Sequence, residues 1–146
     1  MARTSPHHVG DPEDVLDRMA GAPVPGGTAV VIEWSHEKFD APTATWCLDR
    51  LPEAAEPGWP HRHRDRWRAS GGSWETYGAA WAREEGLCGG QDIVRALRRR
   101  FTTPLSEEGP YFFSDPDGVT AADEQAAIDA GRIRATGIRY VGRGPA

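Results

Sequence analysis

The residues best placed to do chemistry lie in the segment GWPHRHRDRW, Gly58 to Trp67. From His61 onward polar residues alternate with arginine, and strict alternation is typical of a β-strand, in which every second side chain shares a face. On such a strand His61, His63 and Asp65 lie together. Two histidines two residues apart can both ligate a metal ion, and a nearby carboxylate or imidazole can complete the site. These three residues are the candidate metal ligands, although we expect neither a metal nor another cofactor.

The opposite face of this expected strand carries only arginine. Alternate strand residues lie about 6.6–6.8 Å apart, close to the spacing of successive phosphates, and flanking tryptophans could stack on bases. Arginines of a later helix could extend the basic surface. Tryptophan and arginine are also the residues that most often anchor protein interfaces. The residues that we predict to bind a partner are Trp59, Arg62, Arg64, Arg66, Trp67, Arg68, Arg95, Arg98 and Arg99.

The charge of the chain argues against nucleic acid as the main partner. The net charge is −5, and residues 1–60 carry four Lys or Arg against ten Asp or Glu. An acidic field of this kind disfavours binding to phosphates. The carboxylates of the first sixty residues could instead pair with the arginines, and surface pairs of that kind contribute little energy. A polar strand or a protein-contact face is therefore preferred to a nucleic-acid site.

Acid–base and nucleophilic groups are few. Glu33 and His36 close the first expected strand, His61 and His63 follow later, and Cys88 precedes two glycines at a helix start, where a thiol pKa can be lowered. These five residues are the candidate catalytic groups, and Glu33 or His36 could also complete the metal site. A pocket between sheet and helices would be lined by aromatic side chains, namely Trp34, Trp46, Trp74, Tyr77 and Trp81.

Local signals divide the chain into helices and strands. Caps, glycine stops and apolar residues three or four apart predict helices, and period-two alternation predicts strands. The short loop after the first strand suggests that it pairs with the next strand as an antiparallel hairpin. The helices are expected at 11–21, 73–86, 89–101 and 120–131. The strands are expected at 28–35, 43–50, 61–70, 110–114 and 132–142, with a turn at 115–118.

Strands come mainly early and helices later, which predicts an α+β fold. We expect a mostly antiparallel sheet of four to five strands with three to four helices packed on it, the last strand lying beside earlier ones. Residues 1–10 are expected to be a flexible tail, 11–142 a single domain and 143–146 a short C-terminal tail. Two cysteines make no disulfide framework, and no apolar run is long enough to span a membrane. We therefore expect a cytoplasmic protein without a membrane partner.

Three functions remain open. The first is a small non-enzymatic protein-interaction module, similar in kind to an immunity, adaptor or inhibitor protein, that binds a protein through its Arg- and Trp-rich surface. The second is a small enzyme or ligand-binding domain that uses the aromatic pocket with histidine and glutamate groups. The third is a nucleic-acid accessory protein that uses the arginines. The arginine-rich, lysine-poor composition, with sixteen Arg and one Lys, suggests a bacterial coding bias, which weakens the case that each arginine was selected for recognition.

Overall fold

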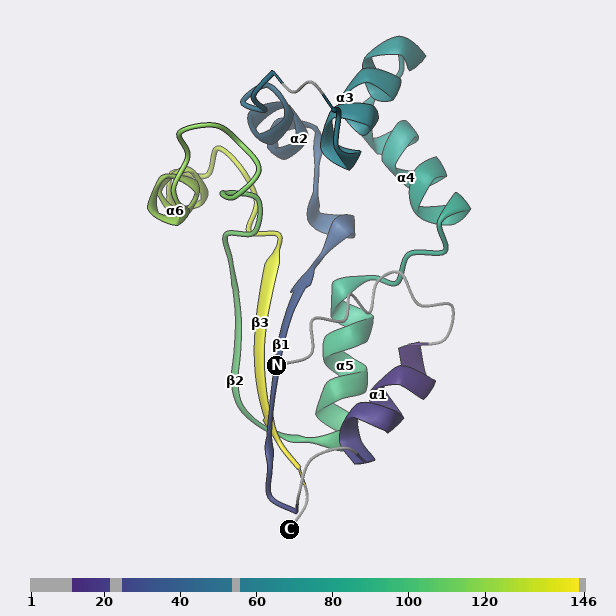
Figure 1. The fold of residues 1–146 in the computed structure, drawn as a ribbon, viewed down its shortest axis with the longest axis vertical. Coiled ribbons are helices and arrows are strands. Elements are labelled where there is room, and N and C mark those ends of the chain that lie inside the picture. The colour runs from purple at the N-terminus through teal and green to yellow at the C-terminus, as the bar shows by residue number, and fades with distance from the viewer. Residues whose placement is uncertain (1–11, 22–24, 54–55, 145–146) are drawn as a thin grey trace.

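The computed structural model describes residues 12–21, 25–53 and 56–144, and within them the chain forms an α+β fold (Figure 1). The predicted class and the antiparallel sheet are confirmed, but the sheet has three strands rather than four to five, and six α-helices form rather than three to four. The elements in chain order are α1 (Pro12–Gly21), β1 (Thr28–Trp34), the 3-10 helix η2 (His36–Lys38), α2 (Ala41–Leu48), α3 (Trp59–Ser70), α4 (Trp74–Glu84), α5 (Gly90–Arg100), β2 (Thr102–Gly109), α6 (Ala121–Asp129) and β3 (Gly137–Arg143).

The last strand lies in the middle of the sheet. The strand order is β1-β3-β2, and β3 pairs antiparallel with both neighbours. The prediction that the final strand joins earlier ones is therefore confirmed. The strand β3 ends at Arg143, while residues 1–11, 145 and 146, which include most of the two predicted tails, lie outside the described residues.

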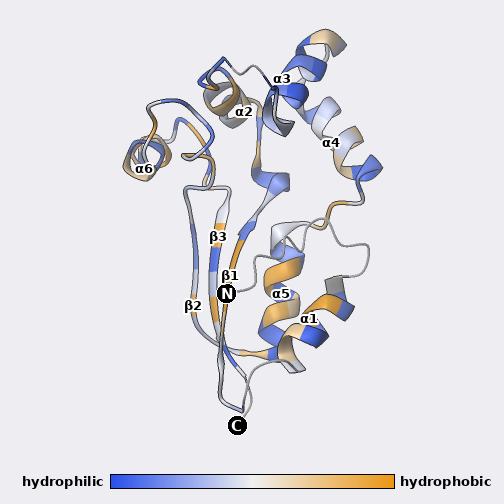
Figure 2. Ribbon diagram, viewed as in Figure 1, coloured by the Kyte–Doolittle hydropathy of each residue, from blue (hydrophilic) through white to orange (hydrophobic). Residues whose placement is uncertain are grey.

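One face of the sheet is covered by α5, with α1 beside it (Figure 1). The stripe predicted for α5 is confirmed, because Ile93, Val94, Leu97 and Phe101 are all buried. They form one core cluster with Val31, Ile138, Tyr140, Leu16 and Ala96. Figure 2 shows apolar residues concentrated along α5 and α1. This cluster fixes α5 on the sheet and leaves its arginines outside.

A second core joins the end of β1 to α2 and α4. It is mostly aromatic, and its buried members are Trp34, Phe39, Ala44, Cys47, Leu48, Trp74, Trp81 and Phe112. The ring centroids of Trp34 and Phe39 lie 5.4 Å apart in an edge-to-face arrangement, which suits aromatic quadrupoles. The indole Nε1 of Trp74 donates to the Phe39 carbonyl at 2.5 Å. The tryptophans therefore build the core that supports the helical end of the molecule.

The strand predicted at 43–50 is wrong, because these residues form α2. Asp40 caps this helix by accepting a hydrogen bond from the Thr43 amide at 3.1 Å, and proline stands in its first turn. Ala44, Cys47 and Leu48, spaced as on one helix face, are buried. The alternation of apolar residues in a segment this short fits both periods, and the cap decides for the helix. The predicted hairpin between 28–35 and 43–50 is consequently wrong.

The strand predicted at 61–70 is also wrong, because it lies within α3. Pro60 stands in the first turn, and Gly71 ends the helix in the left-handed region at φ 65°, as is usual for helix starts and stops. The alternation that suggested a strand was mainly one of polar and charged residues, with Trp67 as the one large apolar side chain. Arginine itself is a good helix former.

The region around β2 differs from expectation as well. Residues 110–114 are irregular, and the strand forms just before them, at Thr102–Gly109. Nearly the whole of β2 is exposed, so its sequence carries no alternation to reveal it. The helices predicted at 11–21, 73–86, 89–101 and 120–131 are confirmed with slightly shorter bounds. The capping box of Thr120 and Asp123 is present at the start of α6.

Candidate functional site

The sheet face opposite α5 is apolar and exposed. Val30 is 51% exposed, Ile32 57% and Leu105 38%. The strand register aligns Val30 with Val141, and Val141 with Leu105, so three aliphatic side chains form one row across all three strands. A solvated face of an antiparallel sheet normally carries polar residues. A contiguous apolar patch on such a face is typical of an interaction site.

A second row on the same face adds charge. The register places Ile32 opposite Arg139, and Arg139 opposite Glu107. Both charged residues are exposed. We call the two rows together the open face; its residues are Val30, Ile32, Leu105, Glu107, Arg139 and Val141. The open face thus has an aliphatic centre with one cationic and one anionic side chain at its margin.

The open face leads into a groove at the end of the sheet nearest α3. The groove has a volume of about 360 Å³ and is lined by Ile32, Trp59, Pro110, Tyr111, Phe113, Ser114, Asp115 and Arg139. Trp59 is 37% exposed, and its ring packs against Trp81 at 6.1 Å and Trp34 at 5.8 Å between centroids. A large side chain held rigid in this way presents contact area at little entropic cost.

The groove also holds a half-buried carboxyl group. Burial raises the pKa of Asp115 above its ordinary value, and the neighbouring His61 opposes that shift. His61 is itself held by a contact of 2.8 Å between its Nε2 and the Pro52 carbonyl. Asp115 and Arg139 therefore place an acidic and a cationic side chain on the wall of a largely apolar groove.

A larger cavity of about 600 Å³ lies on another part of the molecule. Its lining residues are His36, Glu37, Phe39, Asp40, Pro42, Trp74, Glu75, Gly78, Ala79, Trp81, Ala82 and Arg134. Two of the predicted pocket residues, Trp74 and Trp81, are among them. Trp34 is buried in the aromatic core instead, and Trp46 lies under the Arg50 guanidinium, 4.5 Å from its ring centroid.

The carboxylates of this cavity are already used by the fold. Glu37 accepts hydrogen bonds from the amides of Gly90 at 3.0 Å and Gln91 at 3.2 Å, and so caps α5. Asp40 caps α2 and pairs with Arg134 at 2.9 Å. Backbone hydrogen bonds, including one from the Ala41 amide, lower the pKa of Glu75. Groups engaged in this way are poor candidates for proton transfer.

The predicted catalytic residues are distributed over different places. Glu33 is buried on β1 and accepts from the Trp34 amide at 2.8 Å, while Cys88 is half-buried before α5. Of the five candidates, only His36 lines either of the two cavities. The structure therefore does not gather Glu33, His36, His61, His63 and Cys88 into one site.

The predicted metal site of His61, His63 and Asp65 required a strand, and the segment is a helix. On a helix, residues two apart point in different directions, and His61 contacts the Pro52 carbonyl whereas Nδ1 of His63 lies 2.6 Å from the Tyr77 hydroxyl. Asp65 pairs with Arg64 at 2.9 Å. Within the described part of the chain, no group of three or more His, Cys, Asp or Glu side chains could hold a metal ion.

The predicted arginine face is wrong for the same reason. On α3, Arg62 and Arg66 lie on one side and Arg64 and Arg68 on another. Arg62 donates to the Pro57 carbonyl at 2.8 Å, and Arg68 pairs with Asp49 at 2.6 Å. Trp67 is half-buried, with its ring 5.1 Å from that of Trp74. Among the aromatic and basic residues predicted on α3, Trp59 alone lines the groove.

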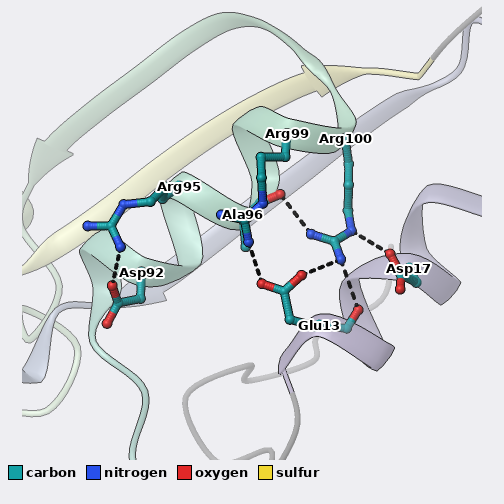
Figure 3. Close-up of polar contacts among 7 residues, drawn as sticks. All are labelled: Glu13, Asp17, Asp92, Arg95, Ala96, Arg99 and Arg100. Carbon is teal, nitrogen blue, oxygen red and sulfur yellow. Dashed lines mark hydrogen bonds and ion pairs between the residues drawn. The ribbon is translucent and has the colours of Figure 1, made fainter.

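The arginines of α5 mostly serve the fold. Figure 3 shows Glu13 of α1 between Arg99 and Arg100, with Asp17 bonded to the Nε of Arg100 at 2.6 Å. Arg95 pairs with Asp92 at 2.7 Å. The alternative that carboxylates of the first sixty residues neutralise arginines is thus confirmed for α1 and α5. Arg98 remains exposed on α5.

The open face was missed in the sequence, apart from its β1 contribution. The alternation of 28–35 correctly placed Val30 and Ile32 on one side of the strand, and Trp59 was predicted as a contact residue. Leu105, Arg139 and Tyr111 were not identified. One signal could have indicated the face: Ala29 to Ile32 is apolar on both sides of the strand, so the side not covered by a helix must remain as an apolar surface.

No family model matches the chain, and comparisons with curated proteins and with solved structures also found no match. Across the described residues, the helices are too short and too polar to cross a membrane.

Proposed function

We propose that this protein is a protein-interaction module that binds its partner through the open face and the adjoining groove. The observation that carries the proposal is the exposure of Val30 and Ile32, 51% and 57%, on an apolar sheet face. Leaving aliphatic side chains in water has a free-energy cost that burial against a partner removes. An interaction surface therefore accounts for these residues better than the fold alone does.

The chemistry of the surface suits a protein rather than a small molecule. The aliphatic row supplies a flat apolar centre, and Trp59 and Tyr111 supply aromatic contacts in the groove. Arg139, Glu107 and Asp115 form a charged margin. An apolar centre with a polar rim and aromatic anchors is the usual composition of a protein interface.

The predicted arginines of α3 and α5, which we call the arginine surface, are poorer candidates for the same role. They are Arg62, Arg64, Arg66, Arg68, Arg95, Arg98 and Arg99. Arg99 and Arg100 are paired with acidic residues of α1, and Arg68 with Asp49. Neutralised arginines attract phosphates weakly, and the whole chain is acidic. We therefore prefer a protein partner to a nucleic acid.

Two variants separate the open face from the arginine surface. The full chain is immobilised, a stoichiometric partner is captured from native lysate and identified, and the purified pair is titrated calorimetrically. Ile32→Glu places a charge in the open face and is expected to weaken affinity at least tenfold, because a desolvated carboxylate would oppose binding. Ile32 is exposed, so this change is tolerated by the fold.

The matched control is Arg98→Glu. Arg98 is an exposed residue of α5, the helix on the other side of the sheet from the open face. The affinity of this variant is expected to equal that of the wild type. Loss of binding in Arg98→Glu with retention in Ile32→Glu would place the interface on the arginine surface instead. A partner that is released by nuclease would support the nucleic-acid hypothesis.

Ligand binding in the larger cavity is a second candidate function. Its volume of about 600 Å³ lies in the range of small-molecule pockets, and two tryptophans in its wall, Trp74 and Trp81, would report binding by fluorescence. Ala79→Trp fills part of this cavity. If the cavity is the functional site, Ala79→Trp abolishes ligand-induced thermal stabilisation, and Ile32→Glu leaves it unchanged. If the open face binds a protein, Ile32→Glu weakens the affinity for that partner, and Ala79→Trp leaves it unchanged.

A further inference from the structure

The outer edge of β1 has backbone hydrogen-bonding groups that no described residue engages. Residue pairs in an antiparallel ladder alternate between bonded and non-bonded. The Ser35 amide bonds to the Thr136 carbonyl at 2.8 Å, and the Gly144 amide to the Gly27 carbonyl at 2.9 Å. The odd-numbered residues of β1 therefore bond to β3, and the even-numbered ones point their amide and carbonyl groups away from the sheet.

Three of these outward residues are available for pairing. The described residues provide no hydrogen-bond partner for the backbone of Thr28, Val30 or Ile32. The fourth, Trp34, differs, because its amide donates to the Glu33 carboxylate at 2.8 Å. The free edge is thus a strip of three alternate residues, Thr28, Val30 and Ile32. It ends at Trp34, whose amide is bonded to the Glu33 carboxylate.

The other edge of the sheet is protected, whereas β1, in the part of the chain that the structure describes, is not. The strand β2 contains Pro104 and the acidic pair Glu107 and Glu108, and its register shifts between Thr102 and Leu105. Proline, charge and irregular register are the features by which edge strands avoid pairing. The segment Thr28–Ile32 has none of them.

We propose that two copies of this chain pair through β1, antiparallel, in the register that places Val30 opposite Val30 of the second copy. This register uses the three free residues and no others, because Thr28 of each copy faces Ile32 of the other. A register shifted so that Val30 faces Ile32 would need the amide of Trp34, which Glu33 already holds.

The strip is self-complementary in charge as well. The chain carries a net charge of −5, so two copies repel each other over most of their surfaces. Thr28 to Ile32 is uncharged, and pairing there brings no like charges opposite one another. A second copy can therefore pair at this edge without local charge repulsion.

Pairing also extends the open face. The row Leu105, Val141 and Val30 would continue directly into the same row of the second copy, because Val30 meets its own counterpart at the dyad. A six-stranded sheet with one unbroken aliphatic row results. The dimer goes beyond the proposed function, because edge pairing does not depend on whether the open face binds a partner.

Sedimentation equilibrium of the full chain tests the dimer. Three pairs of outward residues and a short contact give a weak interface, with a dissociation constant on the order of 1–100 µM. Thr28→Pro removes an outward donor without touching the bonds to β3, and proline is accepted at the first residue of an edge strand. This variant is expected to weaken dimerisation at least tenfold.

Two further variants keep the test decisive if Thr28→Pro disturbs the fold. Val30→Lys puts two cations opposite each other at the dyad and is expected to abolish the dimer. Leu105→Lys, on the same face but on the opposite edge, is expected to leave it intact. A dimer lost in both Val30→Lys and Leu105→Lys would mean that two open faces stack, because both residues lie on the open face, and this result would overturn edge pairing. A dimer retained in Val30→Lys, or a monomeric wild-type chain at several hundred micromolar, would overturn it too.

Spin labels check the register independently. With Cys88 replaced by serine, labels at position 105 of the two copies are separated by five strand spacings, about 24 Å between backbones. Stacked sheets would bring the same positions to about 10 Å. Thr28→Pro keeps Val30 and Ile32, so a monomeric Thr28→Pro variant that still binds the partner agrees with both proposals. A dimer that binds no partner overturns the proposed function. A wild-type monomer that binds its partner overturns the dimer.

Discussion

Gly90 and Ser35 are in such close contact that no side chain fits at Gly90. A Cβ atom there would lie 2.1 Å from the Ser35 hydroxyl and 2.6 Å from Cδ1 of Ile138. Ser35 follows β1 directly and Gly90 is the first residue of α5. This contact sets the distance between α5 and the sheet, so the helix that covers one face is fixed at its N-terminus.

Gly90→Ala is therefore expected to destabilise the fold. Overpacking of a tight contact costs about 1–3 kcal/mol, since α5 must move away from β1 and β3. Urea unfolding followed by tryptophan fluorescence measures the change. The matched control is Gly89→Ala, where a Cβ would meet its nearest atoms at an ordinary 3.5 Å. Equal stability of the two variants would show that α5 can shift at no cost.

The ion pairs between α1 and α5 allow a second prediction. Arg100 bonds to Asp17 at 2.6 Å, to Glu13 at 2.5 Å and to the Ala96 carbonyl at 3.0 Å. Arg100→Ala removes all three, and because the carboxylates are well exposed the loss is about 1 kcal/mol. The effect should shrink at high salt.

Arg98→Ala provides the control for that measurement. Arg98 lies on the exposed side of α5, and its removal is expected to change the free energy of unfolding by less than about 0.5 kcal/mol. Hydrogen exchange adds a local readout, since α1 amides should exchange faster in Arg100→Ala. Unchanged exchange in α1 would mean that its apolar contact through Leu16 suffices to hold it.

How well the elements could be predicted depended on which signals each segment carried. The helix α5 has an apolar stripe of four residues, and α6 has a complete capping box. Both helices were predicted correctly. In the helix α3 only Pro60 is fully buried. Its other contacts with the aromatic core come from Trp59, His63 and Trp67, a stripe too sparse to outweigh the misleading alternation of charges. The strand β2 is exposed and irregular, and pairing with β3 alone makes it a strand.

The candidate site could be predicted only in part. Val30 and Ile32 were placed correctly on one strand face, and Trp59, which was predicted to bind a partner, lines the adjoining groove. Leu105 and Arg139 reach the same surface only because β3 lies between β1 and β2, which is a property of topology rather than of local sequence. His61 and His63 were expected on one face because a strand repeats every two residues. The segment is the helix α3, in which residues two apart point in different directions, so this one wrong element explains why the histidines are separated.

The bond between His63 and Tyr77 gives a pH prediction. Burial, and then the nearby Arg66, lower the pKa of His63 below its ordinary value of 6.5. The unfolded chain therefore binds a proton more readily than the folded one, and this contribution to stability, present above pH 6.5, is lost as the pH falls through that value toward the folded pKa. NMR titration should show His63 midpoints below 6.5.

Arg66→Ala provides a direct check of the cause. Removing that cation should move the pKa of His63 part of the way back toward 6.5. His63→Gln, in turn, should remove part of the fall in unfolding free energy between pH 7.5 and 5. A titration of His63 at or above 6.5 would contradict its burial between Trp81 and the Tyr77 hydroxyl.

The two thiols are expected to differ sharply in reactivity. Cys47 is 1% exposed in the aromatic core, and burial, with a smaller effect of Glu124, raises the pKa of its thiol far above the ordinary value. Cys88 is only half-buried. Since the thiolate is the reactive form, iodoacetamide at pH 8 should modify Cys88 in the folded protein while Cys47 stays intact.

Peptide mass spectrometry of timed samples measures both rates in one experiment. In urea the two cysteines should react alike, because the unfolded chain exposes both. Cys47 modification in native buffer then reports global opening of the aromatic core, so its rate should rise in Gly90→Ala only by the factor that corresponds to the lost stability. Cys47 reacting as fast as Cys88 in native buffer would mean that α2 opens independently of the sheet.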